Sequence, residues 1–290
     1  MRESAFAFAK LNISLDIVSK MDSGYHNMKM VMQTISLSDR VRIECVPGDG
    51  IIIKPGLSYL PCDERNIAVK AALAFFKNTG ISGYQTSIEI SKKIPVCAGL
   101  GGGSSDGACV LRMLNGMFGT NLGREKLESI GLTVGSDVPF CVSGGTCLAE
   151  GRGEILTDLV PLPQCHIVIC KPAFSLSTPE LFGRIRCEKI RARPDTGGII
   201  EALGNGDLLS IARRMYNVFE DALPRGARDI AEIKYAFLDD GALGTVMTGS
   251  GPAVLGLFDD EMRAKLAYEH LRLKYKECYL TQPVGKQEIA

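Results

Sequence analysis

The apolar positions of the first half of the chain follow two different periods, which predicts a mixture of strands and helices. The segments VRIECV (41–46) and QTSIEI (85–90) alternate or cluster apolar residues as strands do. Apolar residues at helical spacing fill ERNIAVKAALAFFKNTG (64–80), and its final glycine is expected to end that helix. The segment REKLESIG (124–131) predicts a shorter helix that also stops at its final glycine.

The second half repeats this mixture. Strands are predicted at HIVICKP (166–172), AVLGLF (253–258) and CYLTQPV (278–284), and a strand followed by a loop is predicted at GTVMTGSG (244–251). Helices are predicted at 207–223, 227–239 and 261–277. The segment LTDLVPLPQC (156–165) carries two prolines and is the best candidate for a boundary. The pattern therefore predicts an α+β protein with two domains, at 1–158 and 159–290.

Composition narrows the class of protein. The chain has 290 residues, 46% of them hydrophobic, which is enough for one large core or two ordinary ones. Lysine plus arginine and aspartate plus glutamate both number 33, so no basic excess points to nucleic acid or an anionic membrane. No apolar run approaches the roughly eighteen residues of a membrane span, and the N-terminal apolar stretch is too interrupted for a signal peptide. We expect a cytoplasmic protein.

The ten cysteines have no metal-site spacing. None forms a CxxC pair, and the chain has only three histidines. Most cysteines lie in apolar segments, where a thiol behaves as a small hydrophobic group. We therefore expect buried free thiols in a reducing compartment, and no zinc-type site.

A glycine-rich segment, GLGGGSSDGACVLRMLN (99–115), is the strongest chemical signal. It follows a predicted strand with a basic end and precedes apolar residues at helical spacing. Unpaired amides at a helix N-terminus, approached closely through glycines, form a cradle for phosphate. The segment matches neither a Walker A loop nor a Rossmann fingerprint. A flexible linker is the alternative, but linkers do not usually join two patterned elements a few residues apart.

Four blocks of sequence resemble a known family. PVCAGLGGGSSDGA (95–108) is similar to the ATP-binding motif of the GHMP kinases. The segments 9–39, 134–154 and 247–258 resemble the signatures of one branch of that family, the 4-diphosphocytidyl-2-C-methyl-D-erythritol kinases. The four blocks occur in the family's order and span most of the chain.

The resemblance implies a fold and an activity. The fold would be a two-domain GHMP kinase, with an N-terminal ribosomal-protein-S5-domain-2-like domain and a C-terminal ferredoxin-like domain. The activity would be phosphorylation of the 2-hydroxyl of 4-diphosphocytidyl-2-C-methyl-D-erythritol by ATP with Mg²⁺, in the non-mevalonate isoprenoid pathway. A GHMP kinase for another small alcohol, such as homoserine or mevalonate, and a non-catalytic nucleotide-binding member are the alternatives. We expect a monomer or a weak homodimer.

Two charged residues are implied to catalyse the reaction. Taken alone, Lys10 would be a solvated surface residue and Asp137 a turn or helix-cap aspartate. The family places this lysine and this aspartate beside the substrate hydroxyl. Asp137 would accept the proton of that hydroxyl, while Lys10 would keep Asp137 ionised and favour the developing alkoxide.

Four further residues are implied to bind the substrate. By the resemblance, Tyr25 would stack on the cytosine, His26 would hydrogen-bond to it, and Phe182 would complete an aromatic sandwich. Asn12 would share a strand face with Lys10 and contact the substrate. From the residues alone, Tyr25 and His26 would be half-buried packing residues, Phe182 a core residue and Asn12 a solvated strand-end amide.

The nucleotide is implied to lie on the glycine-rich segment. The family's binding residues fall here on Pro95, Val96, Cys97, Ala98, Gly99, Leu100, Gly101, Gly102, Gly103, Ser104 and Ser105. A second loop, with Gly249, Ser250 and Gly251, would close over the phosphates, although the residues alone equally suit a plain turn.

The sequence departs from the family's pattern just before the GYH tripeptide. Ser19, Met21 and Ser23 stand where the family has glycine, arginine and aspartate. If that arginine binds the substrate's diphosphate, the chain lacks the contact at this position. No glutamate is clearly placed to bind Mg²⁺, for which Ser104 or Ser105 is the candidate.

Overall fold

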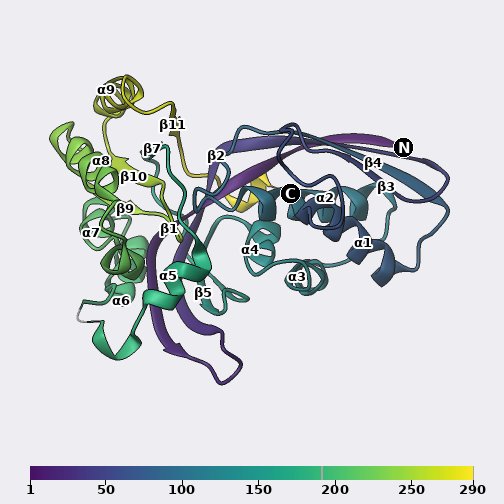
Figure 1. Cartoon of the computed structure of the whole chain (residues 1–290), viewed down its shortest axis with the longest axis horizontal. Coiled ribbons are helices and arrows are strands. Elements are labelled where there is room, and N and C mark those ends of the chain that lie inside the picture. The colour runs from purple at the N-terminus through teal and green to yellow at the C-terminus, as the bar shows by residue number, and fades with distance from the viewer. Residues whose placement is uncertain (191, 290) are drawn as a thin grey trace.

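The computed structural model describes residues 1–190 and 192–289, and their strands form two sheets (Figure 1). The larger sheet has the order β3-β4-β2-β1-β8, and β5 joins it by pairing with β2 and with β6. Its strands are β1 (Arg2–Lys20), β2 (His26–Pro47), β3 (Ile51–Lys54), β4 (Tyr84–Ser91), β5 (Thr146–Gly151), β6 (Ile155–Asp158) and β8 (Tyr216–Asn217). The smaller sheet has the order β11-β7-β10-β9, with β7 (His166–Lys171), β9 (Gly244–Met247), β10 (Val254–Phe258) and β11 (Glu277–Thr281).

Helices accompany each sheet. In Figure 1 the first four lie with the larger sheet: α1 (Ile67–Thr79), α2 (Gly102–Met117), α3 (Arg124–Leu132) and α4 (Val138–Ser143). The later ones lie toward the smaller sheet: α5 (Thr178–Arg184), α6 (Thr196–Gly204), α7 (Leu208–Arg213), α8 (Arg228–Asp239) and α9 (Glu261–Arg272). This is the α+β architecture that the sequence predicts.

The long hairpin of β1 and β2 runs across both halves of the molecule (Figure 1). Strand β2 pairs with β5 through residues 28–33 and with β4 through residues 40–47. Between these stretches the C-terminal segment bonds to β2: Ser36 donates its N–H to the Gln282 carbonyl at 2.9 Å. The larger sheet therefore splits at the middle of β2, next to where the chain leaves β4.

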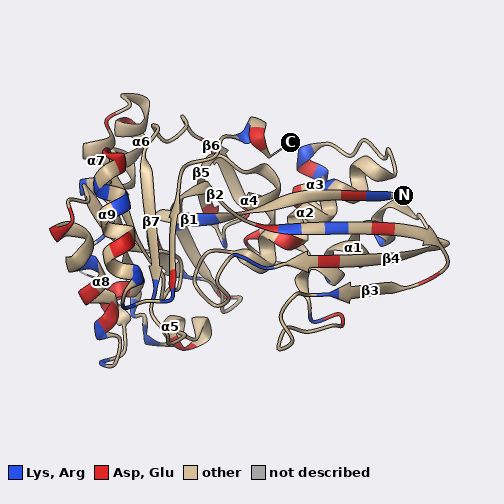
Figure 2. Cartoon of the chain, turned by 90° about the horizontal axis from the view of Figure 1, so that it is seen from above, with Lys and Arg blue, Asp and Glu red and all other residues tan. Residues whose placement is uncertain are grey.

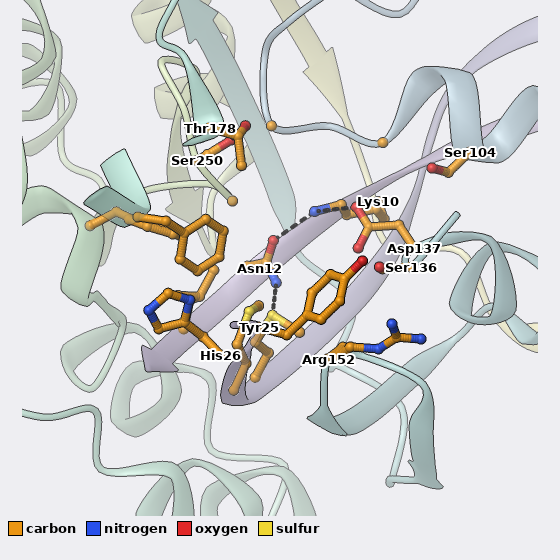
Figure 3. Close-up of a pocket in the computed structure, with 18 of the residues that line it drawn as sticks. Lys10, Asn12, Tyr25, His26, Ser104, Ser136, Asp137, Arg152, Thr178 and Ser250 are labelled. Carbon is orange, nitrogen blue, oxygen red and sulfur yellow. Dashed lines mark hydrogen bonds and ion pairs between the residues drawn. The ribbon is translucent and has the colours of Figure 1, made fainter. Parts of the chain in front are cut away.

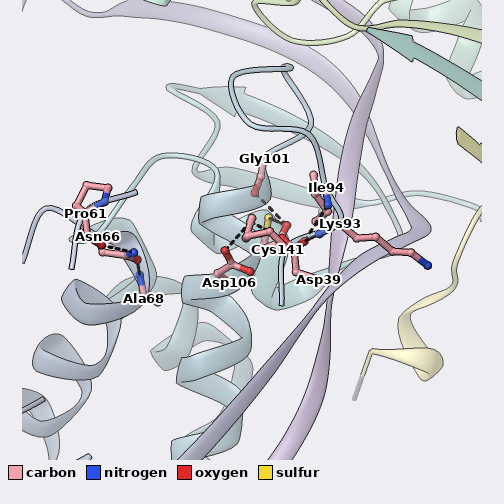
Figure 4. Close-up of polar contacts among 11 residues, drawn as sticks. Asp39, Pro61, Asn66, Ala68, Lys93, Ile94, Gly101, Asp106 and Cys141 are labelled. Carbon is pink, nitrogen blue, oxygen red and sulfur yellow. Dashed lines mark hydrogen bonds and ion pairs between the residues drawn. The ribbon is translucent and has the colours of Figure 1, made fainter. Parts of the chain in front are cut away.

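A buried carboxylate occupies this split. Asp39 accepts the N–H of Ile94 at 2.8 Å, accepts the N–H of Lys93, and pairs with the Lys92 ammonium. Lys92 also donates to Asp106 on α2 at 2.8 Å (Figure 4). Asp39 thus fastens the start of the connection between β4 and α2, which leads into the glycine-rich segment, to the central strand, and Lys92 links it to α2.

Strand β1 changes its register against β2 three times, between Phe8 and Lys10, between Asn12 and Ser14, and between Ile17 and Ser19. Ala9, Leu11 and Ile13 pack in a hydrophobic cluster with β7 and β10, whereas Ala7, Leu15 and Ile17 pack in the larger cluster that contains α1 and α2. Irregularities of this kind redirect side chains within a strand. The stretch from Lys10 to Asn12 is therefore oriented separately from the rest of β1.

Three predicted helices differ in the structure. The helix expected over 261–277 ends at Arg272, and β11 begins at Glu277. The helix expected over 207–223 ends at Arg213, because the chain then forms β8, whose Asn217 donates to the carbonyls of Met247 and Gly249 at 2.7 and 2.8 Å. Helix α3 continues past Gly131, which lies against Val138: a Cβ there would be 2.8 Å from that side chain. The glycine is needed for close helix packing rather than to end the helix.

Burial of the cysteines and the distribution of charge agree with the sequence. The buried cysteines are Cys45, Cys109, Cys141, Cys147, Cys165, Cys170 and Cys278. Figure 2 shows both signs of charge interspersed along β2 and on α8 and α9.

No helix of the described residues is long and apolar enough to cross a membrane. The division at residues 158 and 159 stays a prediction, and β8 from the second half pairs with β1 of the first.

We expect Asp39→Ala to lower the free energy of unfolding by about 3–5 kcal/mol, because it leaves two backbone N–H groups without their acceptor and removes one of the two carboxylates that pair with the buried Lys92. Urea denaturation measures this loss. Arg42→Ala on the same strand removes only an exposed 3.7 Å ion pair with Glu89 and is expected to cost less than about 1 kcal/mol. Equal losses in the two variants would contradict the role given to Asp39.

Candidate active site

A cavity of about 490 Å³ opens beside β1, between the glycine-rich segment and the β9–β10 loop (Figure 3). Its lining brings together eleven of the predicted residues from distant parts of the chain with several others. The predicted ones are Lys10, Asn12, Tyr25, His26, Asp137, Phe182 and Gly249, with Gly99, Gly101, Ser104 and Ser250 at its border with a second cavity.

Lys10 and Asp137 meet in this cavity. The Lys10 ammonium lies 3.4 Å from Asp137 Oδ2 and donates a 2.9 Å hydrogen bond to Asn12 Oδ1. Lys10 is only 5% exposed, whereas the Asp137 side chain is 35% exposed. A buried cation thus holds a carboxylate that remains accessible to a ligand, an arrangement suited to proton transfer at a bound hydroxyl.

The surface-residue interpretation of Lys10 and the solvated-amide interpretation of Asn12 are wrong, whereas the cap interpretation of Asp137 is right for its position but not for its side chain. Lys10 and Asn12 are both buried, so neither is a solvated side chain. Asp137 does occupy the N-cap position of α4, but its side chain makes no capping hydrogen bond. Its carboxylate therefore stays free to face Lys10.

Glycines allow three backbone segments to meet around Lys10. The Lys10 N–H bonds to the Leu100 carbonyl at 3.0 Å, and a Cβ at Gly101 would lie 2.8 Å from Lys10 Cγ. Gly99 packs against the β9–β10 loop, where a Cβ would lie only 2.1 Å from the Thr248 carbonyl oxygen. Gly99 and Gly101 also have φ of +79° and +67°, which side-chain-bearing residues rarely adopt.

A second cavity, of about 360 Å³, lies on the other side of the glycine-rich segment. It is bordered by the N-terminus of α2, where Gly101 is the N-cap and the first-turn amides are free to meet an anion. Of the predicted residues it is lined by Pro95, Val96, Cys97, Ala98, Gly99, Leu100, Gly101, Gly102, Gly103, Ser104, Ser250 and Gly251. Both cavities share Gly99, Gly101, Ser104, Thr178 and Ser250.

Ser105 is the predicted residue that lines neither cavity among the described residues. Its hydroxyl donates to the Gly101 carbonyl at 3.0 Å and lies 3.5 Å from Cys141 Sγ, and the residue is 1% exposed (Figure 4). Ser105 therefore holds the first turn of α2 from the inside. Ser104 is the serine that faces the cavities.

Asp106 also borders the second cavity. Its Oδ2 accepts from Lys92, but its buried Oδ1 has no hydrogen-bond partner among the described residues. Burial, with the nearby Asp39 carboxylate, raises the pKa of Asp106 to about 7 against the opposing effect of Lys92. Asp106 therefore keeps one buried and uncommitted acceptor oxygen near the N-terminus of α2, beside the second cavity.

The other end of the first cavity is aromatic. His26 and Phe182 stack with ring centroids 4.7 Å apart and planes at 20°, and Phe182 meets Phe219 edge-on at 4.9 Å. Burial and the Lys20 ammonium lower the pKa of His26, so its ring is neutral near pH 7. Tyr25 is 55% exposed, which excludes the half-buried packing role for it. Flat aromatic faces at a cavity wall suit a planar base.

The β9–β10 loop is more than a plain turn. Asn12 donates its N–H to Thr248 Oγ1 at 2.9 Å, and Thr178 and Ser250 share a 2.7 Å hydrogen bond between their hydroxyls. A Cβ at Gly249 would lie 3.3 Å from the Lys10 ammonium. The loop therefore joins β1, α5 and the glycine-rich segment at the border of the two cavities.

Sequence reasoning missed several lining residues. Ser136 and Arg152 lie within the block 134–154 and Thr178 lies outside the four blocks, but nothing in their local pattern distinguishes any of the three. Asn66 borders the second cavity as the N-cap of α1, where it accepts from Ala68 N–H at 3.0 Å (Figure 4). A cap asparagine before an apolar helix was a usable signal for the helix start, though not for the cavity.

Comparisons with known proteins agree with this arrangement. The family models for the GHMP kinases N terminal domain and GHMP kinases C terminal match residues 66–145 and 199–277. A 4-diphosphocytidyl-2-C-methyl-D-erythritol kinase of Clostridium botulinum (strain Hall) is 43% identical over 279 residues, covering 96% of this chain and 99% of that protein.

Solved structures match along nearly the whole chain. A crystal structure of 4-(cytidine 5'-diphospho)-2C-methyl-D-erythritol kinase has a TM-score of 0.83 at 30% identity, covering 98% of this chain and 100% of that one. A homoserine kinase from Cytophaga hutchinsonii has a TM-score of 0.77 at 20% identity, covering 98% and 95%, and so shares the fold. The chain therefore belongs to the GHMP kinase family, in the branch of the 4-diphosphocytidyl-2-C-methyl-D-erythritol kinases.

Proposed function

We propose that the chain transfers the γ-phosphoryl group of ATP to the 2-hydroxyl of 4-diphosphocytidyl-2-C-methyl-D-erythritol, giving the 2-phosphate and ADP, a step of isoprenoid biosynthesis. The observation that carries the proposal is the meeting of two cavities at the glycine-rich segment, with the Lys10–Asp137 pair on the acceptor side. Relatives at 43% identity over nearly their full length bear the name of this kinase.

The acceptor hydroxyl would bind beside Asp137. Asp137 would accept its proton as the new phosphate bond forms, and Lys10 would offset the negative charge that develops on the attacking oxygen. Phosphoryl transfer has a loose transition state, so positioning and charge neutralisation supply most of the rate enhancement. The buried, hydrogen-bonded position of Lys10 supports such a fixed charge.

The nucleotide would lie in the second cavity, with its phosphates at the N-terminus of α2 and over residues 95–104. Mg²⁺ prefers oxygen ligands and usually takes several of them from phosphates and water. Ser104 and the uncommitted Oδ1 of Asp106 fit that preference and would hold the ion, which when bound neutralises triphosphate charge. Among the described residues, no three histidine, cysteine or carboxylate side chains cluster as a metal site of their own.

The cytosine would lie at the aromatic end of the first cavity. Tyr25 would stack on the base, and the neutral His26 ring would hydrogen-bond to its edge. Because His26 stacks on Phe182, these rings must separate if the base is to enter between Phe182 and Tyr25. This aromatic end favours a cytidine-linked alcohol over homoserine or mevalonate.

The first test is ADP release with ATP, Mg²⁺ and 4-diphosphocytidyl-2-C-methyl-D-erythritol. We expect Asp137→Asn to lower kcat by about a hundred- to ten-thousand-fold, because the variant keeps the shape of the side chain but cannot accept a proton. Asp259→Asn, an exposed aspartate after β10, is the matched control and should retain full turnover.

Two results would contradict this assignment. Turnover with homoserine or mevalonate, but not with the cytidine substrate, would overturn the proposed substrate. Full activity of Asp137→Asn would leave the kinase in place and remove Asp137 as its base.

We expect Tyr25→Leu to raise KM for the cytidine substrate roughly 5- to 150-fold, because base–aromatic stacking is typically worth about 1–3 kcal/mol. The KM for ATP should not change, since Tyr25 lines only the first cavity. Tyr235→Leu, which removes an exposed ring on α8, is the control. Steady-state kinetics with each substrate varied in turn measures both constants, and parallel changes in the two would argue against stacking.

A further inference from the structure

Arg152 lies at the tip of the turn between β5 and β6, between Gly151 and Gly153. These glycines have φ of +70° and +111°, so the turn relies on conformations that glycine adopts without strain. A Cβ at Gly153 would be 3.7 Å from the Ser136 carbonyl oxygen. The turn therefore packs against the residue that precedes Asp137, at the reacting end of the first cavity.

Arg152 lines that cavity, and its guanidinium makes few contacts with the rest of the protein. It lies 4.8 Å from the centroid of the Tyr25 ring, and its Nε is 3.9 Å from Glu154 Oε1. Among the described residues it donates no hydrogen bond, although a guanidinium has five N–H donors. In Figure 3 the Tyr25 side chain stands between His26 and Arg152. Arg152 is therefore placed to receive an anion rather than to stabilise the fold.

The charges around the cavity leave this role to Arg152. Among the described residues that line the cavity, one is a lysine, Lys10, and one is an arginine, Arg152. Lys10 is buried and already bonded to Asn12 and paired with Asp137, and His26 is neutral because its pKa is lowered. Arg152, with its side chain 31% exposed, is thus the accessible cation of the cavity.

We propose that Arg152 binds the diphosphate of the substrate, an inference that rests on the function proposed above. In that substrate the diphosphate joins the cytidine to the alcohol that is phosphorylated. Arg152 contacts Tyr25, at the base end, and its turn packs beside Ser136, next to Asp137 at the hydroxyl end. The guanidinium thus lies between the two groups that the diphosphate must connect, and its planar fork suits phosphate oxygens.

The test compares binding of cytidine and cytidine diphosphate by isothermal titration calorimetry. The wild-type protein is expected to bind the diphosphate more tightly than the nucleoside. Arg152→Gln should weaken binding of cytidine diphosphate by about 10- to 150-fold, the loss expected for hydrogen bonds to a charged group, and leave cytidine unchanged. Arg152→Lys should retain part of the preference, and Lys29→Gln, which removes an exposed cation paired with Glu150 on β5, should retain all of it.

Kinetics separates binding from chemistry in the same variants. Arg152→Gln should raise KM for the cytidine substrate by a similar factor, with kcat and the KM for ATP within about twofold of wild type. Equal weakening of cytidine and cytidine diphosphate would overturn the proposal, because Arg152 would then act only by holding Tyr25. A fall in kcat with unchanged diphosphate binding would also overturn it, by placing Arg152 on the transferred phosphoryl group.

Failure of this inference is distinguishable from failure of the proposed function. A wild-type preference for cytidine diphosphate that Arg152→Gln retains would overturn the role of Arg152 alone. A wild-type protein that binds neither cytidine nor cytidine diphosphate, and does not turn over the cytidine substrate, would overturn the proposed function and this inference with it.

Discussion

The site depends on the absence of side chains where three backbone segments converge on one lysine. Gly101 packs on the aliphatic stem of Lys10, Gly249 on its ammonium, and Gly99 on the backbone of the β9–β10 loop. A methyl group at any of these positions would meet atoms closer than real Cβ contacts allow, or nearly so, in a backbone conformation that already disfavours it. Because the segments touch, the two cavities meet at a common wall, and Gly99, Gly101 and Ser250 line both of them.

A buried charge network holds that wall in place. Asp39 lies where the larger sheet splits and accepts hydrogen bonds from the backbone that precedes the glycine-rich segment. Lys92 pairs with Asp39 and also donates to Asp106 on α2, so it connects the two elements. The network carries two carboxylates and one ammonium, so it holds excess negative charge next to a cavity suited to phosphate. Burial reduces this negative charge in part, because it raises the pKa of Asp106. A cation bound at the uncommitted Oδ1 of Asp106 would neutralise the remaining charge.

Sequence patterns predicted most of the fold because the local signals agree with the tertiary structure. The helix that ends at Gly80 and the strands at 41–46 and 85–90 lie where periodicity places them. The helix expected over 207–223 failed because Asn217 bonds to the carbonyls of the β9–β10 loop and its neighbour pairs with β1. That contact joins residues distant in sequence, so no local pattern reports it.

The sequence by itself determined the family, and it predicted the phosphate-binding segment and the roles of Lys10 and Asp137, because those signals are contiguous motifs read by resemblance. Only the tertiary structure decided which groups face the cavities. The register shifts of β1 orient Lys10, packing of α2 turns Ser105 inward and leaves Ser104 facing both cavities, and the β5–β6 turn brings Arg152 beside Tyr25. Each of these depends on contacts between distant segments, and side-chain direction at such contacts is set by packing rather than by local propensity.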